Sequence, residues 1–206
     1  MDPPRDPAEL AALWPAVIRL VESVWPRLTN AIPTAARLGA RWQEMSTPFV
    51  AEDGGRVVAH AGVLEIPLVL DGRAVTAAGV HAVCTHPDAR GRGHARRVLE
   101  AALAHAAGRC ETIVLHANDA ALYRKFGFRD VEQCAFVGAP PRAAKAAPMR
   151  PLSSSRPDDV ALLLSAFAAR TPVSHVLGVG SAGPLFVLDE VLGCGGFARL
   201  WWAEDL

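Results

Sequence analysis

The stretch from Cys84 to Val98 reads CTHPDARGRGHARRV and joins a short apolar run to an apolar helical pattern. It contains two glycines and four arginines. The first N–H groups of a helix have no partner within the helix, and the helix dipole places partial positive charge at the same end. Glycine, positive charge and a helix start in one segment therefore predict an anion-binding site.

The spacing of the glycines excludes two common anion-binding loops. A P-loop has the pattern GxxxxGK[ST], and neither that lysine nor the hydroxyl follows here. A dinucleotide-binding loop needs glycine or alanine where Arg96 stands, within a parallel βαβ unit. The pattern that remains is RGRGHA at residues 90–95.

Two helices are predicted ahead of the strands that lead to this loop. The first has a typical start at Asp6, followed by Pro7 and by apolar residues at helical spacing. Pro15 is expected to kink or split it, because proline has no N–H group for the helix. The second helix is predicted over residues 33–45.

Three antiparallel strands are predicted over residues 47–53, 56–70 and 73–85, where β-branched residues and alternation dominate. The pairs Gly54-Gly55 and Asp71-Gly72 between them are typical of tight hairpin turns. Pro67 is expected at a bulge or an edge position, since it cannot donate a ladder hydrogen bond. The loop therefore follows a strand of an antiparallel meander.

The elements after the loop alternate between helix and strand. A helix is predicted from Ala95 to a stop at Gly108. It is followed by a short buried strand at 112–117, a short helix at 119–126 and a strand at 128–138. Residues 139–157, rich in Pro, Ala, Ser and Arg, indicate a linker. A helix at 158–170 and strands at 184–193 and 197–206 are then predicted, and the chain is expected to end inside an element that a longer relative would continue.

The composition indicates a globular chain without a strong overall charge. The 206 residues are 51% hydrophobic and 20% charged, which suffices for one domain with a full core and an extension. The 21 basic and 21 acidic residues balance, so neither nucleic acid nor a membrane is predicted as a partner. The four cysteines lack metal-ligand spacing, and no signal peptide or long apolar run is evident. These features predict a cytoplasmic protein without a metal.

The loop and a tyrosine segment together resemble one enzyme superfamily. RGRGHA is similar to the R/QxxGxG/A pattern of GCN5-related N-acetyltransferases (the GNAT superfamily), and LYRKFGF at 122–128 resembles their tyrosine-bearing helix. The resemblance covers roughly residues 45–137. It implies an α+β fold of three layers, with a mixed, mostly antiparallel sheet flanked by helices. We expect the GNAT domain over residues 1–138, and a linker and C-terminal extension over residues 139–206.

The resemblance also implies how acetyl-CoA, the acetyl donor, would bind. In that superfamily the strand before the loop separates from its neighbour, and the pantetheine arm lies there like an added strand. The backbones of Val83, Cys84 and Thr85 would bind the pantetheine amides. Asn118 resembles the asparagine that holds pantetheine, although it precedes Tyr123 by five residues rather than the more common seven. The residues implied for the pyrophosphate are Arg90, Gly91, Arg92, Gly93, His94, Ala95 and Arg96.

Two side chains are assigned to proton transfer. Tyr123 is the only tyrosine, and the matching tyrosine of the superfamily points at the coenzyme A sulfur as general acid. His81 lies in the strand before the loop, where arylalkylamine N-acetyltransferases place a catalytic histidine, and imidazole accepts a proton near neutrality. The alternative bases are Glu65, His60 and His116, or a chain of waters.

The sequence therefore predicts an enzyme that transfers an acetyl group directly from acetyl-CoA to a primary amine. The acceptor is expected to be a small molecule, with a protein amine as the alternative. The extension could complete the acceptor site, form a homodimer contact or begin a degenerate second domain. Two other readings stay open: a non-catalytic acyl-CoA-binding or regulatory module, which Tyr123 opposes, and a nucleotide-binding protein of another fold, which the hairpin signals oppose.

Overall fold

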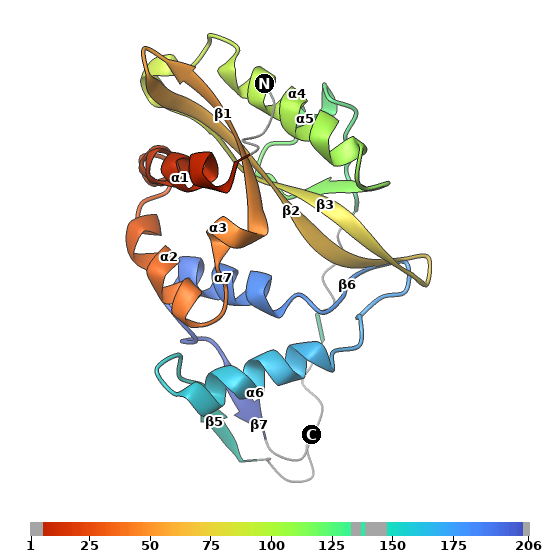
Figure 1. Cartoon of the computed structure of the whole chain (residues 1–206). Coiled ribbons are helices and arrows are strands. Elements are labelled where there is room, and N and C mark those ends of the chain that lie inside the picture. Colours follow the sequence, from red (N-terminus) through yellow and green to blue (C-terminus); the bar gives the residue numbers. More distant parts are fainter. Residues whose placement is uncertain (1–5, 133–136, 139–147, 204–206) are drawn as a thin grey trace.

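The computed structural model describes residues 6–132, 137–138 and 148–203 (Figure 1). A mixed sheet lies between two helical layers, with α4 (His94–Ala107) on one face and the N-terminal helices on the other. Two hydrophobic clusters fill the two sides of the sheet. The predicted fold class, an α+β arrangement of three layers with a mostly antiparallel sheet, is confirmed.

The sheet is built on the predicted meander. β1 (Ser46–Asp53), β2 (Arg56–Leu70) and β3 (Arg73–Thr85) pair in antiparallel fashion, and the bounds of β2 and β3 are those predicted from the sequence. β4 (Ile113–Leu115) pairs with β3 in parallel and is half-buried and shorter than expected. β6 (Leu177–Val179) adds to the far end of β2. Helix α4 is therefore a crossover between parallel strands, which brings its first turn to the end of β3.

Pro67 lies where β2 changes its neighbour on one side from β1 to β6, and not at a free edge of the sheet. Pairing between β1 and β2 ends at Leu64, and the Pro67 carbonyl accepts a hydrogen bond from the Gly180 N–H (2.8 Å). Because the N and the carbonyl of one strand residue point to the same side, the missing N–H of Pro67 faces β6 and costs no bond to β3.

The N-terminal helices agree with prediction at the start and differ further on. α1 (Pro7–Glu22) begins where the Asp6 side chain accepts a hydrogen bond from the Ala8 N–H (2.9 Å), and it continues through Pro15 without splitting. The single helix predicted over 33–45 is instead two, α2 (Leu28–Arg37) and α3 (Trp42–Met45). The break follows from Gly39, which has a left-handed φ of 89°.

The segments after α4 contain two corrections. α5 (Ala121–Arg124) is the short predicted helix, but the described part of the strand expected at 128–138, residues 128–132 and 137–138, forms no strand; residues 133–136 lie outside the described residues. The strand predicted at 184–193 is wrong, because this segment is helix α7 (Gly183–Cys194). Its buried residues Val187, Leu188 and Val191 have helical spacing, which packing against α2 selects over strand propensity.

The remaining elements of the extension pack as one layer beneath the N-terminal helices. α6 (Pro157–Ala168) corresponds to the predicted helix, and β5 (Met149–Pro151) pairs with β7 (Trp201–Ala203) inside the strand predicted at 197–206. Asp159 is fully buried, accepts a hydrogen bond from the Ser153 N–H (2.9 Å) and forms an ion pair with the Arg150 guanidinium (2.7 Å). Residues of α6 and α7 belong to the same hydrophobic cluster as α1–α3.

Candidate active site

A bulge in β3 opens the sheet beside the glycine loop. Ala82 and Val83 together stand opposite a single residue of β2, where the register shifts after His60. Ala82 has a left-handed φ of 48°, which is uncommon for a residue with a side chain. The pairing of β3 with β4 ends at Val80. The two parallel strands therefore separate where the bulge bends β3.

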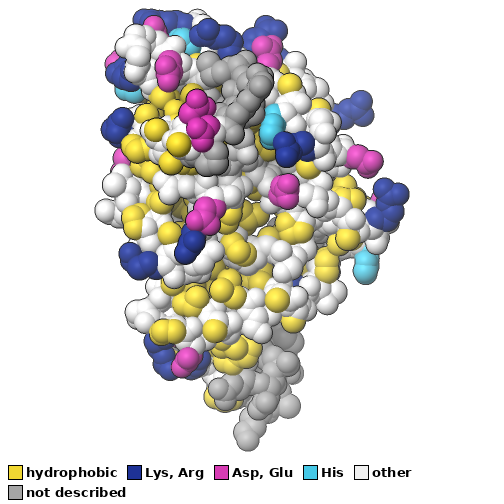
Figure 2. Space-filling view, viewed as in Figure 1, with side chains coloured by type: hydrophobic (Ala, Val, Ile, Leu, Met, Phe, Trp, Pro, Cys, Tyr) yellow, Lys and Arg dark blue, Asp and Glu magenta, His cyan; other side chains and the backbone are white. Residues whose placement is uncertain are grey.

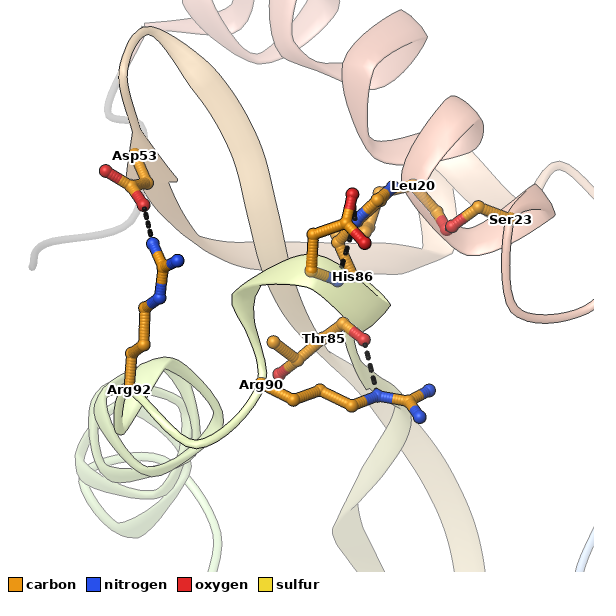
Figure 3. A network of polar contacts seen from close by, with 8 residues as sticks. Leu20, Ser23, Asp53, Thr85, His86, Arg90 and Arg92 are labelled. Carbon is orange, nitrogen blue, oxygen red and sulfur yellow. Dashed lines mark hydrogen bonds and ion pairs between the residues drawn. The ribbon is translucent and has the colours of Figure 1, made fainter.

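The strand beyond the bulge directs backbone groups into this opening. The His86 N–H donates to a carbonyl of β2 (2.8 Å), and alternate residues of a strand point the same way, so the backbone of Cys84 also faces β2. Val83 and Thr85 face the opening, where the Thr85 carbonyl accepts a hydrogen bond from Arg90 Nε (3.4 Å; Figure 3). Of the three residues expected to bind pantetheine, Val83 and Thr85 have the required backbone direction.

The turn between β3 and α4 depends on two glycines. Gly91 and Gly93 have left-handed φ values of 77° and 78°, and a Cβ on either would meet nothing within 4 Å. Gly93 is the N-cap of α4 and has no side chain to accept from the first helical N–H groups, which begin at His94 and Ala95. The space beside the two glycines is open, which allows a pyrophosphate to approach the start of the helix. The loop residues thus fit coenzyme A.

Two arginines near the turn pair with exposed carboxylates. Arg92 Nη1 lies 3.0 Å from Asp53 Oδ2 (Figure 3), and Arg96 Nε lies 2.8 Å from Glu100 Oε1. Exposed ion pairs contribute little to stability, so both guanidinium groups can exchange these partners for a phosphate. The His94 side chain is buried, which leaves its backbone N–H as the group that can reach an anion.

Tyr123 lies on α5 and lines a cavity of about 430 Å³ together with Val83, Asn118 and His81. Burial raises the pKa of the Tyr123 phenol above its ordinary value, so the hydroxyl stays protonated at neutral pH. The ring packs edge-on against Phe128, with 6.1 Å between the ring centroids. The structure therefore brings both residues predicted for proton transfer to the cavity that borders the opening of the sheet.

His81 is half-buried, and its Nε2 lies 2.8 Å from Ser46 Oγ, a contact that the sequence did not predict. The Trp42 ring packs edge-on against it, with centroids 6.0 Å apart. Burial, with a smaller contribution from the neighbouring His60, lowers the pKa of His81 to about 3. The expectation that this imidazole titrates near neutrality is therefore wrong. A Cβ at Gly62 would lie 2.4 Å from His81 Nε2, so the ring position requires glycine there.

The three alternative bases occupy different places. Glu65 is exposed on the face of β2 opposite to Gly62, because the two residues are an odd number of positions apart. His60 is fully buried, burial lowers its pKa to about 4, and its Nδ1 contacts the Ala82 carbonyl (2.8 Å), which holds the bulge. His116 is exposed and lines the Tyr123 cavity. Of the three, only His116 borders the space in which an amine could react.

A second cavity, of about 930 Å³, adjoins the first. The two cavities share Trp25, Val80, His81, Ala82 and His116 in their linings. The larger one extends from these residues across the sheet to α7. A contribution of the extension to the acceptor site was one of the sequence-based alternatives, but the helix that makes it was predicted as a strand.

The sequence model of the acetyltransferase (GNAT) domain matches residues 9–131, which is more than half of the chain. This chain belongs to the GNAT acetyltransferase family. The matched region includes the bulged strand, the glycine loop, α4 and Tyr123. No curated protein matches the chain.

Several solved structures are similar to this GNAT chain over about three fifths of its length. One, from Agrobacterium tumefaciens strain C58 and described as an acetyltransferase, is 28% identical over 62% of this chain and 94% of its own, with a TM-score of 0.47. An aminoglycoside 6'-N-acetyltransferase from Acinetobacter haemolyticus is 15% identical over 63% and 93%, with a TM-score of 0.48. Glucosamine-6-phosphate N-acetyltransferase from Arabidopsis thaliana is 15% identical over 63% and 94%, with a TM-score of 0.44.

Residues beyond 131, including α6 and α7, lie outside the matched GNAT domain. Within the described residues, no helix combines the length and apolar character needed to cross a membrane. The same residues contain no group of three or more His, Cys, Asp or Glu side chains arranged to hold a metal ion.

Proposed function

We propose that this GNAT chain is an acetyl-CoA-dependent enzyme that acetylates a primary amine by direct transfer. The observation that carries the proposal is the opening of the sheet at Ala82, which lies between the glycine loop and the Tyr123 cavity. A donor molecule with a phosphate end and a long arm needs both parts of such a site. Tyr123 and His81 both line that cavity, which supports roles for them in proton transfer at the end of the arm.

The chain's own groups would divide the binding of coenzyme A between them. The N–H groups from Gly91 to Arg96, at the start of α4, would donate to the pyrophosphate. Arg90 and Arg92, both exposed, would add charge-assisted hydrogen bonds. Val83 and Thr85 would bind the pantetheine amides through their backbone, and Asn118 lines the cavity at the far end of the arm.

The reaction requires two proton movements. The amine nitrogen attacks the thioester carbonyl, the new C–N bond replaces the C–S bond, the amine loses one proton and the departing sulfur gains one. Tyr123 would protonate the sulfur, because burial keeps its hydroxyl protonated. His81 would accept the proton from the amine, since its low pKa keeps the imidazole neutral at physiological pH.

Ser46 would set the orientation of that imidazole. If Nε2 donates to Ser46 Oγ, the lone pair on Nδ1 is left to accept the proton. A base with a pKa of about 3 gives little driving force, so the amine must lose its proton late in the reaction or to a second group. His116, which lines both cavities, is the alternative acceptor.

A ligand screen followed by a turnover assay tests this function. Acetyl-CoA and coenzyme A are expected to raise the melting temperature, while ATP and NAD are not, because only a ligand that binds the folded state stabilises it. Release of free thiol in the presence of acetyl-CoA and amines then distinguishes an enzyme from a non-catalytic acyl-CoA-binding module. A chain stabilised by NAD or ATP but not by coenzyme A would refute the proposal.

A further inference from the structure

The larger cavity has a wall that the GNAT domain does not supply. Its apolar lining comes partly from the domain and partly from α7 of the C-terminal extension. The domain contributes Trp25, Leu28 and Ile66, and α7 contributes Leu185, Leu188 and Leu192. Figure 2 shows hydrophobic side chains gathered on the face of the molecule where α7 lies below the sheet.

The leucines on this wall form one stripe of α7. Leu185, Leu188 and Leu192 follow each other at spacings of three and four residues, which places them on one side of a helix. Val187 and Val191 lie on the side that packs into the core shared with α1–α3, and Leu188 lies between the two sides, since it belongs to that core and also lines the cavity. α7 therefore uses one side to attach to the molecule and presents a second apolar side to the cavity.

One ion pair and apolar packing hold this helix in position. The buried Glu190 carboxylate pairs with Arg199 at 2.8 Å, and α7 packs against α2 of the GNAT domain. Buried Val187 and Val191 add to this attachment. The wall is consequently formed before any ligand binds, as is usual for small-molecule sites.

The cavity also leads to the reacting groups. His81, Ala82 and His116 line both it and the smaller Tyr123 cavity. A molecule that occupies the larger cavity can therefore present one end to the place where Tyr123 and His81 meet the donor. This arrangement is the one required of an acceptor site.

We propose that α7 completes the acceptor site and that the acceptor is a primary amine carried on an aromatic or alkyl body; this rests on the proposed acetyltransferase function. Leucine and tryptophan walls leave sugar hydroxyls or additional ammonium groups without partners, which makes burial of such groups costly. Arg27 and Asp189, the charged lining residues, are both exposed and carry opposite signs, so neither sign of ligand is favoured at the mouth. The choice of acceptor amine then depends on the apolar interior of the cavity.

The test compares four amines with acetyl-CoA as donor: phenethylamine, octylamine, spermidine and glucosamine. Free thiol is measured as coenzyme A is released. We expect kcat/KM for phenethylamine and octylamine to exceed the values for spermidine and glucosamine by at least about ten-fold, within the range that apolar pockets achieve. Equal or reversed preference would overturn the proposal, and so would a failure to acetylate either apolar amine while acetyl-CoA raises the melting temperature.

Two matched variants test whether the preference for apolar amines depends on α7. Leu192→Gln alters the cavity wall, and Leu177→Gln makes the same change on β6, outside both cavities; each leucine is 39% exposed. Leu192→Gln is expected to lower kcat/KM for octylamine about ten-fold and to leave the KM for acetyl-CoA unchanged, whereas Leu177→Gln changes neither. Equal behaviour of the two variants would overturn the role of α7. If acetyl-CoA neither stabilises the chain nor is consumed, the proposed function itself fails, which is a different result.

Discussion

Replacing Gly93 with valine tests whether the glycine loop binds coenzyme A through its backbone. Gly93 has a φ of 78°, and a Cβ there would meet no protein atom within 4 Å. The Cβ that Gly93→Val adds therefore has room within the chain. Its side chain would instead occupy the open space in front of α4, which the proposal assigns to the pyrophosphate.

Gly72→Val is the matched control. Gly72 lies in the turn between β2 and β3, has a φ of 75°, and also has nothing within 4 Å of a built Cβ. The left-handed backbone is strained for any residue with a side chain, by about 1–3 kcal/mol. For a chain of this size each kcal/mol corresponds to roughly 2–4 °C in melting temperature. Both variants are expected to lose similar stability in the absence of ligand.

Thermal unfolding with and without acetyl-CoA separates the two effects. At a concentration of 100 times its Kd, a ligand stabilises the folded state by about 2.7 kcal/mol, or roughly 5–11 °C here. We expect this increase in the parent chain and in Gly72→Val, and its loss in Gly93→Val. If acetyl-CoA stabilises Gly93→Val as much as Gly72→Val, the loop does not hold the pyrophosphate.

Three further changes test other parts of the molecule. Tyr123→Phe is expected to lower kcat by about 10²–10⁴-fold with little change in the KM for acetyl-CoA, because it removes one general acid; full turnover would exclude that role. Gly62→Ala forces His81 away from its position, since the new Cβ would lie 2.4 Å from Nε2, and it should lower kcat while acetyl-CoA still binds; unchanged kcat would exclude His81 as the base. Arg199→Ala leaves a buried carboxylate without its partner and should lower the melting temperature by several degrees. Arg41→Ala is the control, because Arg41 belongs to an exposed ion pair and its side chain is about as exposed as that of Arg199 (63% against 62%). It should change the melting temperature by about a degree at most. Equal losses of melting temperature in the two variants would contradict this reasoning.

The parts of the fold that the sequence predicted are those fixed by local chemistry. The turn residues Gly54-Gly55 and Asp71-Gly72 determine where β2 begins and where it gives way to β3, so both strands could be delimited to the residue. Where local preference and packing disagree, packing decides. The α7 segment contains Phe186, Val187 and Val191, whose types favour strands, yet it is helical because Val187 and Val191 are buried at helical spacing.

In the candidate site, too, local features could be predicted from the sequence, whereas contacts between distant segments could not. The loop glycines could be recognised because their spacing along the chain reflects one local turn. The contact between Ser46 and His81 joins residues 35 positions apart, and no pattern in the sequence announces it. The pKa of His81 likewise depends on burial by distant segments such as that of Trp42, so it could not be inferred from residue type.

Burial lowers the pKa of the proposed base, His81, and raises the pKa of the proposed acid, Tyr123. The pKa of His81 lies at about 3, so its imidazole is neutral and able to accept a proton at every pH above that value. The pKa of Tyr123 is raised, so its phenol can donate a proton up to and beyond its ordinary pKa. Between these limits neither group changes its charge. The acidic limb of kcat/KM should therefore belong to the acceptor amine and move with the amine's own pKa when two acceptors of different basicity are compared. A limb that stays at the same pH for both acceptors would instead show an enzyme group that ionises there, and would exclude His81 as the base.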